Sequence, residues 1–417
     1  CISILCHNVF LFDLSYNIIY SNGIHVLQES PLAIKSDMVL QPTTLEIIQT
    51  KLHRPPVPHD LVAREHLVDR LNKRLNRPLS LVCAPAGYGK STLVSSWLEN
   101  CDLPSVWLSL DETDNDLHLF LSYILTTIRT IFPEVGQEIQ TVLKGQELPP
   151  VSFLTGCFVN ELDKIDTPFI LAIDDYHIIQ NNAVHELIAG VIKHPPHAMH
   201  LVLVSRIDPP LPLTTLLAKG YMTEVRVRDL RFSRKEIAEY LEQALETTIK
   251  ENIVSIFDEK SEGWITGLRL ATLSMQHKDD IERVVASLPD ANRFILDYFV
   301  EEILSQQPEA IQDCLLATSV LDRFCAPLCE VVFISISETT PDNGGINGQG
   351  FLQLLKKNNL FVIHLDDEGR WFRYHHLFKN LLRRRIKHRL TRDDIEAIHT
   401  RVSTWCAENG HFVEAIQ

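Results

Sequence analysis

A glycine-rich run that ends in lysine, serine and threonine carries the clearest chemical signal in this sequence. Residues 84–92 have the spacing of a phosphate-binding loop, with Ala84 in the place of the usual first glycine. Glycines let the backbone curl until successive N–H groups face one point, where phosphate oxygens can accept their hydrogen bonds. An apolar run precedes this loop and a helical pattern follows it, which is the expected context. The residues that we assign to nucleotide binding here are Ala84, Gly87, Tyr88, Gly89, Lys90, Ser91 and Thr92.

A second apolar run ends in two acids and predicts the other half of the same chemistry. Residues 169–173 lead into Asp174 and Asp175. Parallel strands bring their carboxyl ends to one edge of a sheet, so Asp174 would lie near the loop and hold Mg²⁺ together with the Ser91 hydroxyl. Lys90 would reach the β- and γ-phosphates. Asp175 is expected to polarise the attacking water, and because it is one methylene shorter than glutamate we expect slow hydrolysis.

A third polar side chain follows another apolar run. Residues 201–204 lead into Ser205 and Arg206. If this strand lies next to the central one, Arg206 comes near the γ-phosphate, where a cation would distinguish ATP from ADP. The alternative is a surface arginine that pairs with Asp208.

Alternating strand and helix patterns form the frame for these residues. Short apolar runs separated by helical stretches predict a parallel sheet covered on both faces. A helix is also expected from 61 to 75, before the first run. The predicted strands are 79–84, 105–110, 169–173, 201–204 and 224–227.

The strand pattern stops after residue 232. Residues 233–319 read as successive helices, and two β-rich runs around a turn at 366–369 predict a hairpin. Helices followed by such a hairpin are typical of a winged-helix domain. The predicted fold class is α/β: a P-loop NTPase with a parallel sheet covered by helices, followed by an α-helical lid and a winged-helix domain.

These changes of pattern also set the expected domain limits. The predicted order is an unassigned N-terminal extension at 1–41, a P-loop NTPase domain at 42–232, a helical lid at 233–305, a winged-helix domain at 306–390 and the truncated start of helical sensor repeats at 391–417.

Taken together, the ordered motifs resemble the MalT-type signal-transducing ATPases, which are bacterial regulators of the LuxR-family class within the STAND group of P-loop NTPases. The resemblance runs from about residue 50 to the end of the chain. The segments that carry it are 51–56, 84–92, 107–112, 171–177, 205–212, 229–232, 262–269, 319–323 and 371–378.

The resemblance implies a nucleotide-dependent switch. ADP would hold the core, lid and winged helix closed, and an inducer with ATP would open them for self-association. A winged-helix histidine would touch the ADP β-phosphate, for which His375 or His376 is the nearest match; a core or surface histidine pair is the alternative. Adenine contacts would come from the segment that holds Val62 and Arg64. A sensor for a small-molecule or protein inducer and a DNA-binding helix-turn-helix would lie beyond Gln417.

Composition limits the remaining classes of function. Lys and Arg number 39 against 54 Asp and Glu, so the net charge of −15 disfavours whole-surface nucleic-acid binding. We find no apolar stretch of about 18 residues that would span a membrane, and nine cysteines in an odd count suggest reduced thiols in the cytoplasm. Two other functions remain open: a constitutive AAA-like ATPase, and a non-catalytic interaction scaffold that the nucleotide only stabilises.

Overall fold

The computed structural model describes residues 47–145, 147–273, 293–337, 346–358, 360–366 and 368–410. The extension expected at 1–41 and the end of the expected repeat segment, at 411–417, lie outside the described residues. Of the helices that the structure describes, none is both long enough and apolar enough to cross a lipid bilayer.

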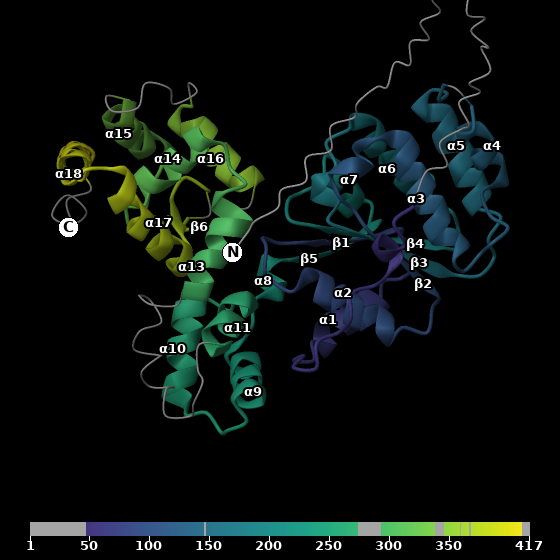
Figure 1. The fold of residues 1–417 in the computed structure, drawn as a ribbon, viewed down its shortest axis with the longest axis horizontal. Helices are drawn as coiled ribbons and strands as arrows, with labels where there is room; N and C mark the ends of the chain where they lie inside the picture. Colours follow the sequence, from purple (N-terminus) through teal and green to yellow (C-terminus); the bar gives the residue numbers. More distant parts are fainter. Residues whose placement is uncertain are drawn as a thin grey trace, which may run out of the picture. The chain divides into compact units, whose positions relative to one another are not determined.

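Five parallel strands form one sheet in the order β2-β3-β4-β1-β5 (Figure 1). Each coincides with one of the apolar runs, so the predicted parallel sheet is confirmed. Because β4 lies between β1 and β3, the carboxyl ends of these three strands are neighbours at one edge of the sheet. The strands are β1 (Leu79–Cys83), β2 (Ser105–Ser109), β3 (Phe169–Asp174), β4 (Met199–Ser205) and β5 (Met222–Arg226).

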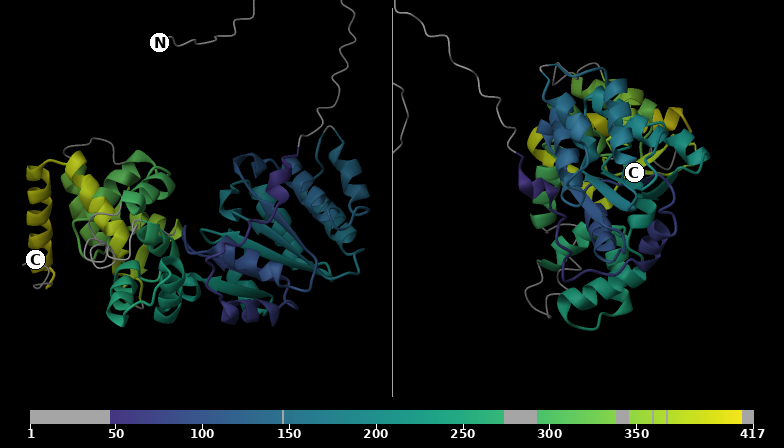
Figure 2. Two further views of the ribbon diagram at one scale, coloured as in Figure 1. Left: turned by 60° about the horizontal axis from the view of Figure 1, so that its bottom comes forward. Right: turned by 90° about the vertical axis from the view of Figure 1, so that its right-hand side faces the viewer.

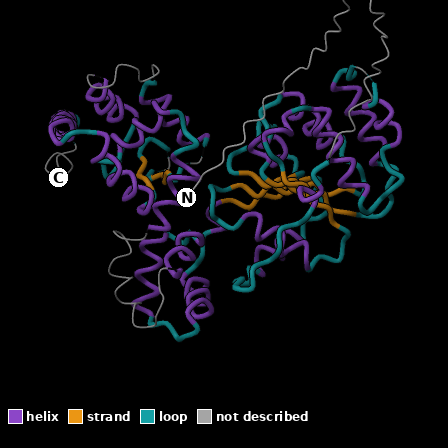
Figure 3. Tube along the Cα trace, viewed as in Figure 1, coloured by secondary structure: helices purple, strands orange, loops and turns teal. Residues whose placement is uncertain are grey.

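Helices cover both faces of this sheet, as the alternating pattern predicts (Figures 1 and 3). Successive residues of a strand face opposite sides. Leu79 and Leu81 therefore pack with the helices α3 to α7, whereas Val82 packs with α1 and α2. These helices are α1 (Glu65–Asn72), α2 (Lys90–Glu99), α3 (Leu117–Arg129), α4 (Gln137–Leu143), α5 (Val151–Leu162), α6 (Asn182–Lys193) and α7 (Leu213–Ala218).

The helix expected from 61 to 75 is shorter than predicted. It begins at Glu65, and residues 61–64 are not helical. Val62 is buried with 2% of its surface exposed, but it lines a pocket rather than a helix face. Val62 is an apolar residue that is buried because it lines this pocket. It therefore fitted the helical pattern, and the predicted helix began four residues too early.

Beyond β5 the described chain consists of helices and an antiparallel hairpin (Figure 2). The predicted hairpin is confirmed: β6 (Val362–His364) pairs with β7 (Phe372–Tyr374). We call α9 (Arg234–Leu245), α10 (Glu251–Ser261) and α11 (Ile265–Leu273) the lid helices. The other helical elements are α8 (Val227–Leu230), α13 (Arg293–Phe299), the π-helical turn Val300–Leu304, α14 (Glu309–Thr318), α15 (Ala326–Ser337), α16 (Gly348–Lys357), α17 (His376–Arg389) and α18 (Arg392–Glu408).

One hydrophobic cluster runs from the α2 face of the sheet into the helices that follow it. It includes Val82 in β1, Trp97 in α2, Trp264 beside the lid helices and Phe378 in α17. A well-packed cluster transmits displacement, because its side chains have little free volume to absorb it. The loop at the end of β1 is therefore mechanically connected to the hairpin region.

Candidate nucleotide-binding site

The predicted phosphate-binding loop joins the end of β1 to the start of α2. Gly89 is the N-cap of α2 and has a φ of 75°, a left-handed conformation that glycine adopts without a steric penalty. Gly87 also has a φ of 75°, and a Cβ atom built on it would lie 2.7 Å from both Trp264 Nε1 and Thr266 Oγ1. Both glycines are thus required by the backbone, and Gly87 also by the side chains packed against it.

Two hydrogen bonds join this loop to the start of α11. The indole Nε1 of Trp264 donates to the carbonyl of Ala86 at 3.1 Å, and the backbone N–H of Thr266 donates to the carbonyl of Gly87 at 3.2 Å. A change in the shape of the loop is therefore expected to move the start of α11.

Lys90 lies inside the loop and is almost completely buried. Its Nζ donates a hydrogen bond to the carbonyl of Pro85 at 3.0 Å. Burial, with a smaller effect of the nearby Arg206, lowers the pKa of Lys90 to about 8. An anion at this point would favour the charged amine, so the position suits the phosphate contact predicted for Lys90.

The predicted acids lie at the carboxyl end of β3. Asp174 is 4% exposed and accepts a hydrogen bond from the backbone N–H of Asp175 at 2.9 Å. Burial, and then the neighbouring Asp175, raise the pKa of Asp174 to about 6, while a hydrogen bond with Ser91 acts in the opposite direction. The structure thus brings together Ser91 and Asp174, the two residues predicted to hold Mg²⁺. Asp175 is left-handed, with a φ of 56°, and its side chain is partly exposed beside them.

Arg206 follows β4, close to the loop and to the π-helical turn Val300–Leu304. Its guanidinium is near enough to Lys90 to lower the pKa of that amine, and it forms an ion pair with Glu302 at 3.3 Å. The predicted alternative partner, Asp208, is engaged by Arg226. Arg206 is therefore in position to sense charge at the loop.

A pocket that opens to solvent adjoins the loop at Tyr88 and Gly89. Apolar and aromatic side chains from several segments form its walls, which suits a planar base. Its lining includes Val62, Leu93, Leu230, Phe232, Tyr240, Ile265 and Thr266.

The two residues of the segment before α1 that were expected to touch adenine differ in their surroundings. Both line this pocket. The guanidinium of Arg64, however, donates to the carbonyls of Asp229 and Leu230 and pairs with Glu236 at 2.6 Å. Arg64 thus stabilises the junction of α8 and α9, whereas Val62 contributes apolar surface to the pocket.

The two candidate histidines of the hairpin point in different directions. His375 is 1% exposed; its Nε2 lies 2.9 Å from the carbonyl of Ser261, and its Nδ1 accepts from the backbone N–H of Leu377. Burial lowers the pKa of His375 to about 4, so the ring is neutral at pH 7. His376 is about half exposed at the surface. The structure therefore places one histidine in the core and the other outside it.

The pocket also includes Phe232, Tyr240 and Thr266, which the sequence pattern does not indicate as site residues. Phe232 belongs to a motif that carried the resemblance, but nothing in its spacing indicates a pocket wall. Tyr240 is one apolar-face residue of α9 among others. These positions become neighbours only when the chain folds the lid helices against the loop.

Substituting Gly87 with alanine should weaken nucleotide binding, because the new methyl group would overlap Trp264 and Thr266. A matched control is Gly220→Ala: Gly220 also has a positive φ, of 70°, but a Cβ there meets no atom within 4 Å. Both variants carry the backbone cost of about 1–2 kcal/mol. Titration with a fluorescent ATP analogue should show an affinity loss in Gly87→Ala alone. An equal loss in both variants would contradict the close approach of the lid to the loop.

The loop between a parallel strand and a helix, with an acid at the end of a second strand, defines the class as a P-loop NTPase fold. A solved structure has the same fold: the Walker-type ATPase of Pyrococcus abyssi matches with a TM-score of 0.54 at 16% sequence identity, over 79% of this chain and 98% of that one.

Residues 300–394 match the family model of the MalT winged helix domain. Over 373 residues the chain is 31% identical to the HTH-type transcriptional regulator MalT of Yersinia enterocolitica and, equally, to that of Yersinia pestis strain Pestoides F. Each alignment covers 89% of this chain and 40% of the relative, so the chain spans about two-fifths of the length of the curated relatives it matches. The resemblance predicted from the sequence is thereby confirmed: the chain is homologous to the MalT transcriptional regulators and contains their winged-helix domain.

Proposed function

We propose that the chain is the ATP-binding switch module of a MalT-like transcriptional regulator, with slow ATP hydrolysis and ATP/ADP-controlled self-association. The observation that carries this proposal is the pair of hydrogen bonds from Trp264 and Thr266 to the phosphate-binding loop. A switch needs its ligand site to contact the part that moves, and here the loop contacts the lid directly.

The nucleotide phosphates would lie on the loop and the base in the adjoining pocket. The N–H groups at the start of α2 and the amine of Lys90 supply positive charge for the phosphates. Val62, Leu230 and Phe232 offer apolar surface for the base. Homology to a transcriptional regulator favours a cytoplasmic location, as the sequence predicts.

Magnesium fits the same set of residues. Asp174 is a buried carboxylate whose pKa is raised by burial, and a cation beside it would favour its charged form. Ser91 and Asp174 would hold the ion, which when bound neutralises charge on the phosphates. Asp175, at the same strand end, would orient and polarise the attacking water.

The nucleotide can act as a switch only if it binds two conformations with different affinity. Arg206 offers a basis for such a difference, because it lies near the loop and pairs with Glu302 in the π-helical turn Val300–Leu304. A γ-phosphate near Arg206 would compete with Glu302 for the guanidinium, whereas ADP would leave that ion pair in place. His375 or His376 remains the proposed contact from the winged helix. We propose that inducer and DNA contacts belong to segments after Gln417, as the resemblance implies.

Sedimentation velocity tests this proposal. The wild-type chain should sediment as a smaller species with ADP than with a slowly hydrolysed ATP analogue and Mg²⁺, and Lys90→Ala should show no difference. ATP turnover is expected to stay below about 1 per second. Fast turnover without an inducer would instead support a constitutive AAA-like ATPase, and identical sedimentation in all states would support a scaffold.

A further inference from the structure

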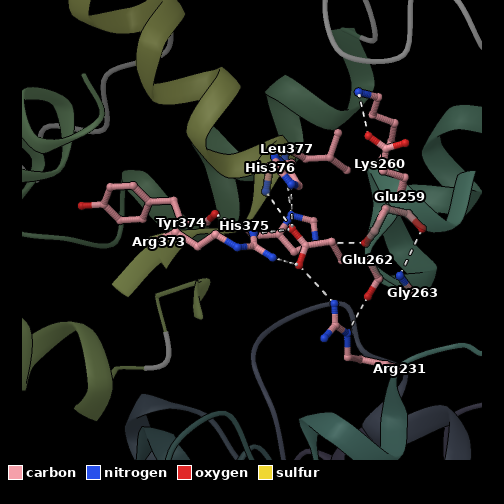
Figure 4. Close-up of polar contacts among 11 residues, drawn as sticks. Arg231, Glu259, Lys260, Glu262, Gly263, Arg373, Tyr374, His375, His376 and Leu377 are labelled. Carbon is pink, nitrogen blue, oxygen red and sulfur yellow. Dashed lines mark hydrogen bonds and ion pairs between the residues drawn. The ribbon is translucent and has the colours of Figure 1, made fainter. Parts of the chain in front are cut away.

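A single carboxylate joins three parts of the chain, and we propose that it is the latch of the closed state. Glu262, at the corner between α10 and α11, is held by Arg231 from the end of the nucleotide-binding domain and by Arg373 from the winged-helix hairpin (Figure 4). Release of Arg373 from Glu262 would free the winged helix from the lid. This inference rests on the proposed function, because it names the contact through which that switch is regulated.

The contact with the winged helix is bidentate. Arg373 donates from its two terminal nitrogens to the two carboxylate oxygens of Glu262, at 2.8 and 3.0 Å. The backbone N–H of His376 adds a hydrogen bond to the same carboxylate at 3.2 Å, and His375 contacts the carbonyl of Ser261. Paired, charge-assisted hydrogen bonds of this kind are both stronger and more direction-dependent than single ones. The hairpin therefore docks on the α10–α11 corner in one defined orientation.

The contact with the nucleotide-binding domain uses the same residue. Arg231 donates from Nε to the backbone carbonyl of Glu262 at 2.7 Å and from a terminal nitrogen to its carboxylate at 3.1 Å. The next residue, Phe232, donates its N–H to the carbonyl of Gly263 at 2.9 Å. Gly263 allows this approach, since a Cβ there would lie 2.6 Å from the carbonyl of Phe232.

Among the charged and polar side chains at this contact, the carboxylate of Glu262 is the one that both arginines need as a partner. Glu262 is 7% exposed and faces two guanidinium groups, while the buried ring of His375 is neutral. Burial by itself would raise the pKa of Glu262, but the hydrogen bonds from Arg373 and the surrounding positive charge outweigh it and lower that pKa to about 2. A buried carboxylate is costly without its partners, so losing Arg373 favours a rearrangement that exposes Glu262 to water.

The latch lies two residues from the loop contact. Glu262 is followed by Gly263 and then by Trp264, whose indole donates to Ala86 in the phosphate-binding loop. On the other side, the ring of Phe361 from the start of the hairpin lies 6.2 Å from that of Tyr88 in the loop. A displacement of the loop can therefore reach Glu262 through only a few packed residues. For this reason we assign the role of latch to Glu262 rather than to another ion pair.

Removing the ion pair between Glu262 and Arg373, while keeping the one between Glu262 and Arg231, tests the latch. Arg373→Gln in the full chain with ADP should raise amide hydrogen exchange in peptides covering 261–266 and 372–376 by about tenfold or more. It should also speed the release of a fluorescent ADP analogue. Arg373→Lys, which keeps the charge but loses the paired geometry, should give an intermediate value. Arg389→Gln is the matched control, because Arg389 pairs with Glu309 and Asp313 inside the winged-helix domain.

Exchange and ADP release in Arg373→Gln that equal those of Arg389→Gln would overturn the latch. A fall in the melting temperature of Arg373→Gln with unchanged ADP release would also overturn it, because that result describes a merely structural contact. The proposed function fails in a different way: the wild type would then ignore the nucleotide in sedimentation, even though Arg373→Gln still loosened the hairpin.

Discussion

Replacing Lys90 with alanine should abolish detectable ATP binding. The amine is the buried positive charge of the loop, and its removal takes away the lysine contacts to the phosphates. Hydrogen bonds to charged groups contribute about 1.5–3 kcal/mol each, so losing contacts to two phosphates should lower the affinity at least about 100-fold. Isothermal titration calorimetry with Mg²⁺ and ATP measures the loss.

The control for this experiment is Lys73→Ala. Lys73 is an exposed lysine that pairs with Asp69 within the same helical segment, so its loss changes the net charge equally without touching the loop. The Lys73→Ala variant should bind ATP as the wild type does. Binding by Lys90→Ala in the wild-type range would refute the assignment of this loop to phosphate.

Truncating Trp264 to alanine should be among the most destabilising single substitutions in the chain. The indole is fully buried, stacks on Phe299 at 4.7 Å between ring centroids and meets Phe361 edge-on at 5.4 Å. Large aromatic-to-alanine changes in a core cost about 3–5 kcal/mol, because they remove buried surface and leave a cavity. Urea unfolding of Trp264→Ala should show a loss of this size.

A milder substitution separates packing from the loop contact. Trp264→Phe keeps most of the ring but loses the N–H that donates to Ala86, a change of about 1 kcal/mol in stability. Trp107→Phe loses a partly buried hydrogen bond from its indole to Ser109 within β2, rather than one to the loop. Nucleotide affinity should fall in Trp264→Phe and not in Trp107→Phe. An unchanged affinity in both would mean that the lid does not act on the loop.

The sequence predicts the sheet well because the central strands β1, β3 and β4 are buried on both faces and therefore read as mostly apolar runs. The same holds for the acids at the strand ends: once the sheet is parallel, Asp174 and Arg206 must lie at the edge that carries the loop. The hairpin was predictable because a turn at 366–369 separates two β-rich runs. These features depend on local pattern and on simple topology.

The contacts between domains could not be predicted from local sequence pattern or from simple topology. Glu262 forms its ion pairs with Arg231, 31 residues before it, and with Arg373, 111 residues after it. No periodicity connects such positions, and the motif that contains Glu262 does not indicate its partners. For the same reason the sequence could not tell which of the two adjacent histidines is buried. The chain after β7 buries His375 and leaves His376 exposed.

The measurement that tests the central claim most directly is the identity of the nucleotide that copurifies with the chain. The protein is denatured, the released small molecules are separated by chromatography, and Lys90→Ala is treated in parallel. We predict stoichiometric ADP from the wild type and none from the variant, as expected for a switch resting in its closed state. A wild-type chain that is empty and also fails to bind added ATP would contradict the account.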